Sequence, residues 1–392
     1  MNIKSRSISI RFEHQILSIY AVCVFLYAIM QSNISIQFPI VKSVMMGSFV
    51  ALLILGVFFS LKHKTTIRKK DAMLLAAFLI LLLYNILNNG FENGTIFIIP
   101  FCYLLMDCKI ENILKKYSKS TFLAILFVIL LCKIGILNNQ TFTNAATTFK
   151  VRQGLGFIWT TFAPNMFLSA VLAFVSYRKG KINLIELLLL FFVNLYLYSQ
   201  TKTLAAFLCV LLCLICVCLF KSSKVQQFCF SNKFFEFIFN HFAIIVAIFT
   251  ILFQLYYNAK VNGSVMLNAL NRATSFRLGL GQVAFENYKI TFLGQWIEWN
   301  QGTNQNYFYL DSSYLSILFN NGIVMLLFIC LLMDIVGKYG MKVRNYFLVT
   351  ALSIFLIHCI TDPQLIDFRN NPFYMIVLQC FFYLRQSKKN NV

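Results

Sequence analysis

The sequence predicts an all-α, polytopic integral membrane protein with about 12 transmembrane helices, both termini in the cytoplasm and one large extracytoplasmic loop. Three observations carry this prediction. Of the 392 residues, 59% are hydrophobic and only 12% are charged, with a mean hydropathy of +0.73. Apolar runs near twenty residues long recur along the whole chain, and short basic clusters separate them. No soluble domain needs that much apolar surface.

Length and apolar content place the spans one after another along the chain. The fourth is short and contains Pro100, which indicates a broken or tilted helix. The 12 cysteines mostly lie within the apolar runs and show no metal-type spacing, so we expect packed or lipid-facing thiols, no metal and no cofactor. We expect spans near residues 15–31, 43–61, 71–88, 94–107, 120–137, 155–177, 182–199, 203–220, 234–257, 314–333, 345–360 and 372–386.

The loops between these spans predict the orientation. Alternation puts about 24 of the 34 Lys and Arg residues on the side that holds both termini, and such an excess marks the cytoplasmic side. The long segment 258–313 is then extracytoplasmic, together with loops 138–154 and 361–371. The chain shows no linker or internal repeat, so residues 1–392 are expected to form a single membrane domain.

The outer side nevertheless carries basic residues in three separate loops, against the charge rule. They are Lys150, Arg152, Arg272, Arg277 and Arg369. Arg369 alone could contact lipid headgroups, but three loops that meet on one face are better explained by an anion site, since guanidinium groups bind phosphate through paired hydrogen bonds. The net charge of +21 forms no continuous stripe, which argues against a nucleic-acid partner.

Four stretches, in this order, resemble motifs of one family. They are "VRQGLGFIWTTFAPNMF", "YSQTKTLAAFL", "SFRLGLGQVAFENYKITFLGQ" and "LDSSYLSILFNNGIV". Between residues 151 and 324 the chain resembles bacterial O-antigen and capsular polysaccharide polymerases of the Wzy type, within the superfamily that also contains the O-antigen ligases. The last two stretches open and close the largest predicted loop, as in that family.

The resemblance implies an inverting glycosyltransferase in the bacterial inner membrane, with its active site facing the periplasm or exterior. Donor and acceptor would both be oligosaccharide repeat units on undecaprenyl pyrophosphate, with membrane lipid and a chain-length regulator protein as further partners. Arginines in a partly desolvated cleft would stabilise the leaving pyrophosphate. We expect Arg152, Arg272 and Arg277 to do this, with Lys202 in an outer turn adding charge.

Such a transfer needs a base that takes a proton from the acceptor hydroxyl. Asp311 lies at the outer mouth of the tenth span and is our candidate for the base, with Arg277 beside it in the catalytic group. Helix capping explains Asp311 equally well. Rival bases on the same face are Glu286, Glu298, Asp362 and Asp367.

Aromatic residues crowd the end of the large loop. Their rings could stack on sugars or form an interfacial belt. The residues concerned are Trp296, Trp299, Tyr307, Tyr309 and Tyr314.

Two other functions remain open. A lipid-linked oligosaccharide flippase would be expected to carry charges deep in its spans and to show symmetry between its halves, whereas here the acids and arginines gather at one face. An O-antigen ligase usually has histidine where this chain has Asp311, a difference that favours the polymerase.

Overall fold

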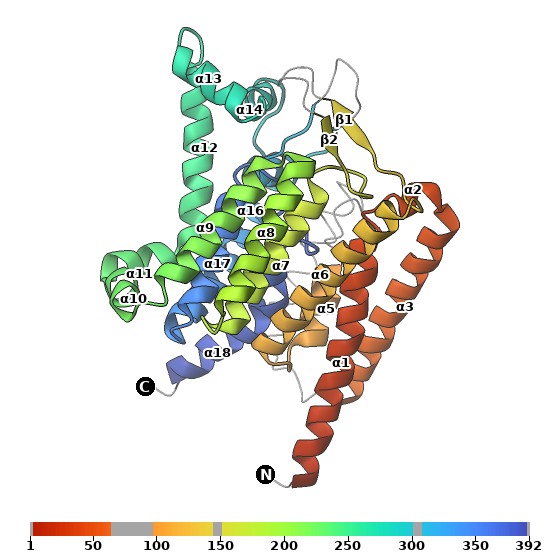
Figure 1. The fold of residues 1–392 in the computed structure, drawn as a ribbon. Helices are drawn as coiled ribbons and strands as arrows, with labels where there is room; N and C mark the ends of the chain where they lie inside the picture. The colour runs from red at the N-terminus through yellow and green to blue at the C-terminus, as the bar shows by residue number, and fades with distance from the viewer. Residues whose placement is uncertain (1–2, 64–96, 144–150, 301–307, 390–392) are drawn as a thin grey trace.

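A computed structural model describes residues 3–63, 97–143, 151–300 and 308–389 of the chain. These residues are predominantly helical, as expected, with one small two-stranded sheet that the all-α prediction did not include. The start of α1 and the end of α18 lie at one end of the helical assembly. The sheet and the helices α13 and α14 lie at the opposite end (Figure 1).

Five of the described helices are long and apolar enough to cross a membrane. A sixth span results if α9 and α10, which are bent by 112° relative to each other, count as one. The chain is therefore a helical protein with several helices suited to a membrane. The five segments are Phe12–Ile29, Pro39–Phe58, Leu184–Thr201, Phe242–Lys260 and Gly322–Lys342.

The first helices differ from the predicted spans mainly at their ends. The described part of the expected span 94–107 begins at residue 97 and is α-helical over the eight residues of α5. The span expected at 120–137 begins ten residues earlier, with Glu111 in its first turn. The span expected at 71–88 lies outside the described residues. The helices here are α1 (Ile3–Ile29), α2 (Ile34–Gln37), α3 (Pro39–His63), α5 (Ile98–Leu105) and α6 (Ile110–Lys133).

The predicted outer loop 138–154 contains the two strands of the sheet. Strands β1 (Thr141–Thr143) and β2 (Val151–Gln153) pair antiparallel. Helix α7 (Phe162–Arg178) follows, with Pro164 in its first turn, where a missing N–H costs no helical hydrogen bond. A capping box of Asn183 and Glu186 begins α8 (Leu184–Thr201), and α9 (Leu204–Leu219) packs beside it.

The span expected at 234–257 is interrupted at His241. Helices α10 (Ser223–Phe230) and α11 (Lys233–Asn240) precede the break, and α12 (Phe242–Lys260) follows it. Asp334 of α16 accepts a hydrogen bond from the N–H of Ala243 at 2.9 Å and so caps α12 from a neighbouring helix. This contact gives the buried acid within α16 a structural role.

The expected large loop 258–313 contains two helices of its own, α13 (Val265–Ala273) and α14 (Arg277–Asn287). Both lie beyond the end of α12 (Figure 1). Ser264 caps α13 through its side chain, and Ser275 and Phe276 adopt positive φ angles of 57° and 64° between the two helices. This tight reversal fixes where Arg277, the first residue of α14, begins its helix.

The predicted tenth span is two helices, α15 (Ser313–Asn320) and α16 (Gly322–Lys342), with a break that the large loop fills. The N–H of Gln295 donates to the carbonyl of Asn320 at 3.1 Å, and the N–H of Ile323 donates to that of Thr291, also at 3.1 Å. Gly294 has a φ of 98°, and a Cβ there would lie 2.2 Å from the Asn320 oxygen. The broken helix ends are thus satisfied by a loop that only glycine lets this close.

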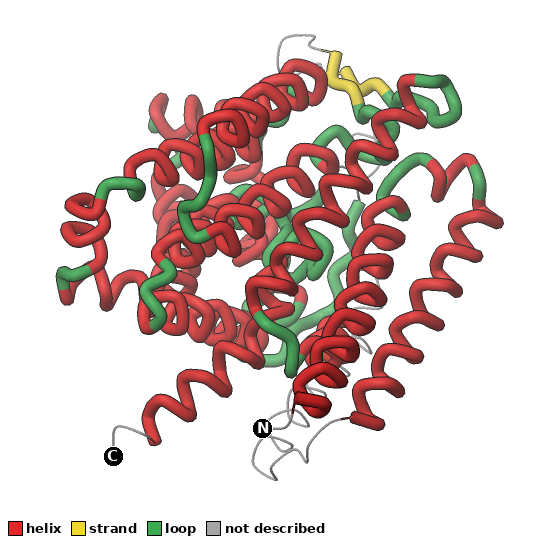
Figure 2. The backbone as a smooth tube through the Cα atoms, turned by 60° about the horizontal axis from the view of Figure 1, so that its bottom comes forward, coloured by secondary structure: helices red, strands yellow, loops and turns green. Residues whose placement is uncertain are grey.

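The C-terminal helices enclose a loop. Helix α17 (Tyr346–His358) ends in the segment 359–371, most of which is buried, and a 3-10 turn η3 (Pro372–Ile376) then leads into α18 (Val377–Lys389). Figure 2 shows loop backbone surrounded by helices. Asn371, which is fully buried, donates to the carbonyl of Leu365 at 2.9 Å and caps η3 at Phe373. Such internal partners are required where a loop is removed from water.

Candidate functional site

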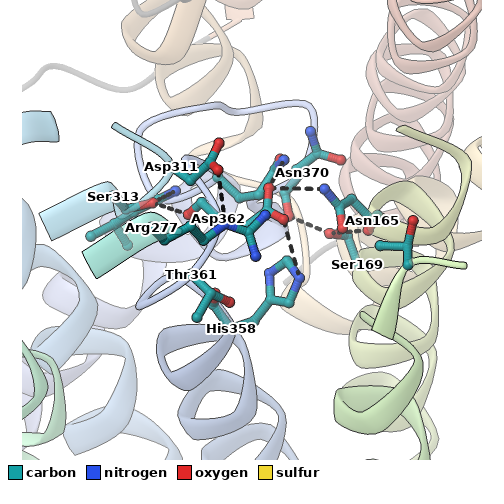
Figure 3. Close-up of polar contacts among 12 residues, drawn as sticks. Asn165, Ser169, Arg277, Asp311, Ser313, His358, Thr361, Asp362 and Asn370 are labelled. Atoms are coloured by element: carbon teal, nitrogen blue, oxygen red, sulfur yellow. Dashed lines mark hydrogen bonds and ion pairs between the residues drawn. The ribbon is translucent and has the colours of Figure 1, made fainter. Parts of the chain in front are cut away.

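A cluster of polar side chains lies where the large loop, the segment 359–371 and the start of α7 meet. Figure 3 shows Arg277 and Asp311 approaching it from one side, Asn165 and Ser169 from α7 on the other, and His358 from below. Asp362 lies among them. Residues that are far apart in the sequence therefore share one site near the end of the helical assembly opposite the termini.

Arg277 and Asp311 form an ion pair. The Nε of Arg277 donates to Oδ2 of Asp311 at 2.8 Å, and the two side chains are 25% and 23% exposed. Burial raises the pKa of the Asp311 carboxyl, and the adjacent Arg277 offsets part of that rise. A partly accessible carboxylate with a raised pKa beside a guanidinium is suited to proton transfer near an anion.

The capping explanation for Asp311 does not match its contacts. Ser312 occupies the N-cap position of α15 and makes no side-chain capping hydrogen bond. The carboxylate of Asp311 turns to Arg277 instead. Ser313, the first residue of α15, donates its hydroxyl to the carbonyl of Asp362 at 2.6 Å and accepts the N–H of Leu365 at 3.0 Å. The start of α15 is thereby tied to the segment 359–371.

Asp362 is the buried carboxylate of the cluster, with 4% of its surface exposed. Its Oδ1 accepts hydrogen bonds from the amides of Asn165 at 2.9 Å and Gln364 at 2.8 Å. Burial raises the pKa of Asp362, while the charge of Arg277 and these two donors lower it in part. Asp362 is thus a second carboxyl group close to Arg277, held in a fixed position by two amide donors.

His358 points its imidazole at Asp362 from the last residue of α17. Nε2 lies 3.8 Å from Oδ2 of Asp362, one helical turn away in sequence. Within the described part of the chain, neither ring nitrogen of this buried side chain has a hydrogen-bond partner. A buried imidazole without partners beside a carboxylate is costly for folding, and such groups are common at functional sites.

Arg152 reaches the same region from β2. Its Nε donates to the carbonyl of Thr201 at 2.9 Å, and Nη2 donates to Oγ1 of Thr203 at 3.3 Å. Burial and the positive charge of Arg277 lower the pKa of Arg152. The two guanidinium groups are therefore near enough for their charges to repel, and a shared anion between them stays a prediction.

Arg369 is engaged elsewhere. It binds Asp367 through Nε at 2.6 and 2.8 Å and lies over the ring of Tyr27, 5.3 Å from the ring centre. Burial lowers the pKa of Arg369, but Asp367 more than compensates, so the pKa is raised overall. Asp367, a predicted rival base, is therefore the counterion of Arg369 and also accepts a hydrogen bond from Asn370 at 3.1 Å.

Several predicted residues lie apart from the cluster. Arg272 is exposed on α13, where its side chain makes no hydrogen bond or ion pair with any described residue. Lys202 is exposed at the end of α8, next to the threonines that hold Arg152. Glu286 bonds Gln282 on α14, and Glu298 is exposed. The structure thus pairs Arg277 with Asp311, places Arg152 within range of the charge of Arg277 and leaves Arg272 outside.

The predicted sugar-binding aromatic residues differ in accessibility. Trp296 is 64% exposed, and Trp299 packs against Phe308 and Tyr309 with ring centres 5.2 and 5.6 Å away. Tyr314 has no exposed surface, and its hydroxyl donates to the carbonyl of Leu356 at 2.9 Å, so it has no free face for a sugar. Tyr307 lies outside the described residues.

Sequence reasoning missed the α7 side of the site. Asn165 bonds Asp362, and Ser169 bonds the carbonyl of Asn370. Polar residues four apart on an otherwise apolar helix lie on one face, and this spacing was the available signal. His358 and Asp362 have the same spacing.

The arrangement can bind an anion and accept a proton at neighbouring points. Among the described residues, no group of three or more His, Cys, Asp or Glu side chains could hold a metal ion. Comparison with known protein families, curated proteins and solved structures gave no match.

Proposed function

We propose that this protein is a polysaccharide polymerase, an inverting glycosyltransferase that joins oligosaccharide repeat units carried on undecaprenyl pyrophosphate. The observation that supports it most is the ion pair of Arg277 and Asp311 at the loop end of an apolar helical assembly, with Arg152 within range of the charge of Arg277. The positive charge of the two arginines suits a pyrophosphate leaving group, and the carboxylate of Asp311 suits the proton of an attacking sugar hydroxyl.

The proposal includes a topology of about 12 spans in the bacterial inner membrane, with both termini cytoplasmic and residues 258–313 outside. Its support is the excess of Lys and Arg on the predicted cytoplasmic side, together with the position of α13, α14 and the sheet opposite the chain ends (Figure 1). The site then faces the periplasm or exterior, where lipid-linked repeat units are available.

Each group in the site has a role in the proposed reaction. The Asp311 carboxylate takes the proton of an acceptor hydroxyl, whose oxygen bonds the anomeric carbon of the donor as the bond from that carbon to the pyrophosphate oxygen breaks. The electron pair leaves on the pyrophosphate. Arg152, held along one edge by Thr201 and Thr203, turns its remaining N–H groups to that developing charge.

Asp311 is a better base than Asp362 on grounds of access. Its side chain is 23% exposed, whereas Asp362 is 4% exposed and already accepts two amide donors. Asp362 instead fixes the position of Arg277 by charge and of α15 through Ser313. In this proposal Asp362 holds neighbouring groups in place, and Asp311 takes the proton.

An O-antigen ligase is the second candidate, and His358 is the observation that favours it. The related ligases typically carry a histidine in place of Asp311, and this chain brings a buried imidazole to within 3.8 Å of Asp362 in the same cluster. A ligase would pass finished polymer to a terminal acceptor instead of extending it.

Deletion of the gene in its own host separates these functions by gel analysis of surface glycan. The polymerase predicts single repeat units on the acceptor and loss of long chains. Long polymer that lacks its terminal acceptor indicates a ligase. Repeat units that accumulate on lipid inside the cell indicate a flippase, and an unchanged glycan pattern refutes all three.

A further inference from the structure

We propose that α10 and α11 form a surface that lies flat on the membrane and binds anionic lipid headgroups. This surface, called here the α10–α11 surface, comprises residues 221–240. It projects from the side of the helical assembly between the end of α9 and the start of α12 (Figure 1). It shares no residue with the candidate site and does not depend on the proposed function.

The direction of α10 follows from the bend at its start. Its axis makes an angle of 112° with that of α9, close to perpendicular. Helix α9 packs beside α8, and α12, which follows α11 after the break at His241, is itself apolar and long enough to cross a membrane. Because α10 leaves α9 at nearly a right angle, and α9 packs beside the candidate span α8, α10 runs along the membrane surface.

The position of this surface is fixed by packing beneath it. Phe230 is 5% exposed and stacks on Tyr346 with ring centres 4.3 Å apart, and it also contacts Phe220 and Phe239. At Gly337 of α16 a Cβ would lie 2.8 Å from the carbonyl oxygen of Phe239, so α11 packs directly on α16. The α10–α11 surface therefore cannot fold its outer side chains inward.

Large apolar side chains on the outer face have no cover in the described structure. Phe228 is 75% exposed, Phe234 65% and Phe237 61%. On α11, Phe234 and Phe237 are three residues apart and share one face, while Glu236 points well away from it. Apolar rings this exposed, at the level where a membrane helix begins, are suited to the boundary between headgroups and acyl chains.

The charges identify the lipid. Lys221, Lys224 and Lys233 are exposed along the same surface, against the single acid Glu236. A cationic, apolar helix pair is complementary to a lipid surface that presents phosphate and lacks a compensating amine. A soluble protein partner would have to displace lipid from residues adjoining a membrane helix, which makes lipid the favoured occupant.

The test uses the full-length protein reconstituted in lipid nanodiscs and tryptophan quenching. Phe228→Trp and Phe237→Trp introduce probes on the apolar face, and Glu236→Trp is the matched control on α11. Lipids brominated near the headgroup and others brominated deep in the acyl chain report the depth of each probe, after subtraction of the unsubstituted protein. Elution as a single species in detergent checks that each variant folds.

We expect the probes at 228 and 237 to be quenched at least twofold more than the probe at 236, and more by shallow than by deep bromine. Equal, weak quenching at all three positions means that the face meets water or protein and overturns the proposal. Strongest quenching by deep bromine means that α10 and α11 are part of a span, and it overturns the proposal equally.

Headgroup preference is measured with the probe at 237 and spin-labelled phosphatidylglycerol or phosphatidylcholine. Each lysine close to an anionic surface is worth roughly fivefold in binding at low salt. The anionic label should therefore quench several-fold more, and the Lys221→Gln, Lys224→Gln, Lys233→Gln triple variant should lose this preference while its depth profile is unchanged. Equal quenching by both labels in the protein with all three lysines refutes anionic recognition.

Discussion

Asp311→Asn separates the proposed proton-transfer role of Asp311 from its structural role as a partner of Arg277. Asparagine has nearly the same size as aspartate, and its side-chain oxygen can still accept the hydrogen bond from Nε of Arg277, which lies 2.8 Å from the carboxylate. The amide cannot take a proton at neutral pH. The substitution therefore removes the proposed chemical role of Asp311 and keeps most of its contacts.

The two expected losses differ greatly in size. Arg277 stays charged, so its hydrogen bond to the asparagine oxygen is still worth about 1.5–3 kcal/mol, and the change removes mainly the ion-pair attraction, at most about 1 kcal/mol of stability. Both side chains are about a quarter exposed, and this reduces the loss further. Loss of a general base typically slows a reaction by about 10²–10⁴, or about 3–5 kcal/mol in the barrier.

The assay uses purified protein and a lipid-linked repeat unit from the host, with products resolved by length on a gel. Glu298→Gln is the matched control, because Glu298 is an exposed acid in the same predicted loop. We expect its rate of chain extension to stay near that of the unchanged protein. Thermal unfolding of both variants shows whether the fold persists.

The pH profile gives an independent check. The base works in its ionised form, so the rate should fall as the pH drops through the raised pKa of Asp311. Arg277→Gln removes the cation that lowers this pKa, and the acid limb should move to higher pH. Stability responds with the opposite sign: because the folded pKa exceeds the unfolded one, the Asp311 term favours folding below the unfolded pKa and weakens as the pH rises through the folded value.

Chain extension at the normal rate by a folded Asp311→Asn variant would refute the base assignment. An unfolded Asp311→Asn variant would refute the small stability loss worked out above, since the substitution leaves the hydrogen bond from Arg277 in place. Asp362→Asn is then the next variant, with an expected loss of stability because its carboxylate is buried and accepts two amides.

Three further predictions concern topology and folding. Reporter fusions at Lys224 and Glu298 should report opposite sides of the membrane, and the same side for both contradicts the proposed orientation. Gly294→Ala should lower the unfolding temperature far more than Gly263→Ala. Both glycines have positive φ, but only at Gly294 would a Cβ meet backbone, 2.2 Å from the Asn320 oxygen. Equal shifts would mean that the loop moves to make room for the Cβ. Asp367→Asn should destabilise the fold by up to about 3–5 kcal/mol in thermal or denaturant unfolding, because it leaves the partly buried Arg369 without its counterion. An unchanged midpoint would show that Arg369 is solvated without Asp367.

The sequence by itself predicted a helical chain with several helices suited to a membrane, and it named several residues of the candidate site. Apolar runs of this length predict membrane helices because a helix satisfies its own backbone hydrogen bonds where water is absent. Five helices long and apolar enough to cross a membrane are present in the described residues. Arg152 and Arg277 became candidates because they lie on the predicted outer side, where basic residues are disfavoured, and position relative to predicted spans can be read without the fold.

Tertiary structure decided which candidates meet. Arg272 and Arg277 are five residues apart, yet the reversal at Ser275 and Phe276 sends one to the exposed side of α13 and the other to Asp311. Asn165 joins Asp362 across 197 positions of the sequence, and Tyr314 lies buried although its neighbours form the site. Helix breaks such as Asn321–Gly322 depend on a distant loop for their hydrogen bonds. The physical reason is that pairing between side chains depends on the packing of separate helices, which local hydropathy and spacing do not encode.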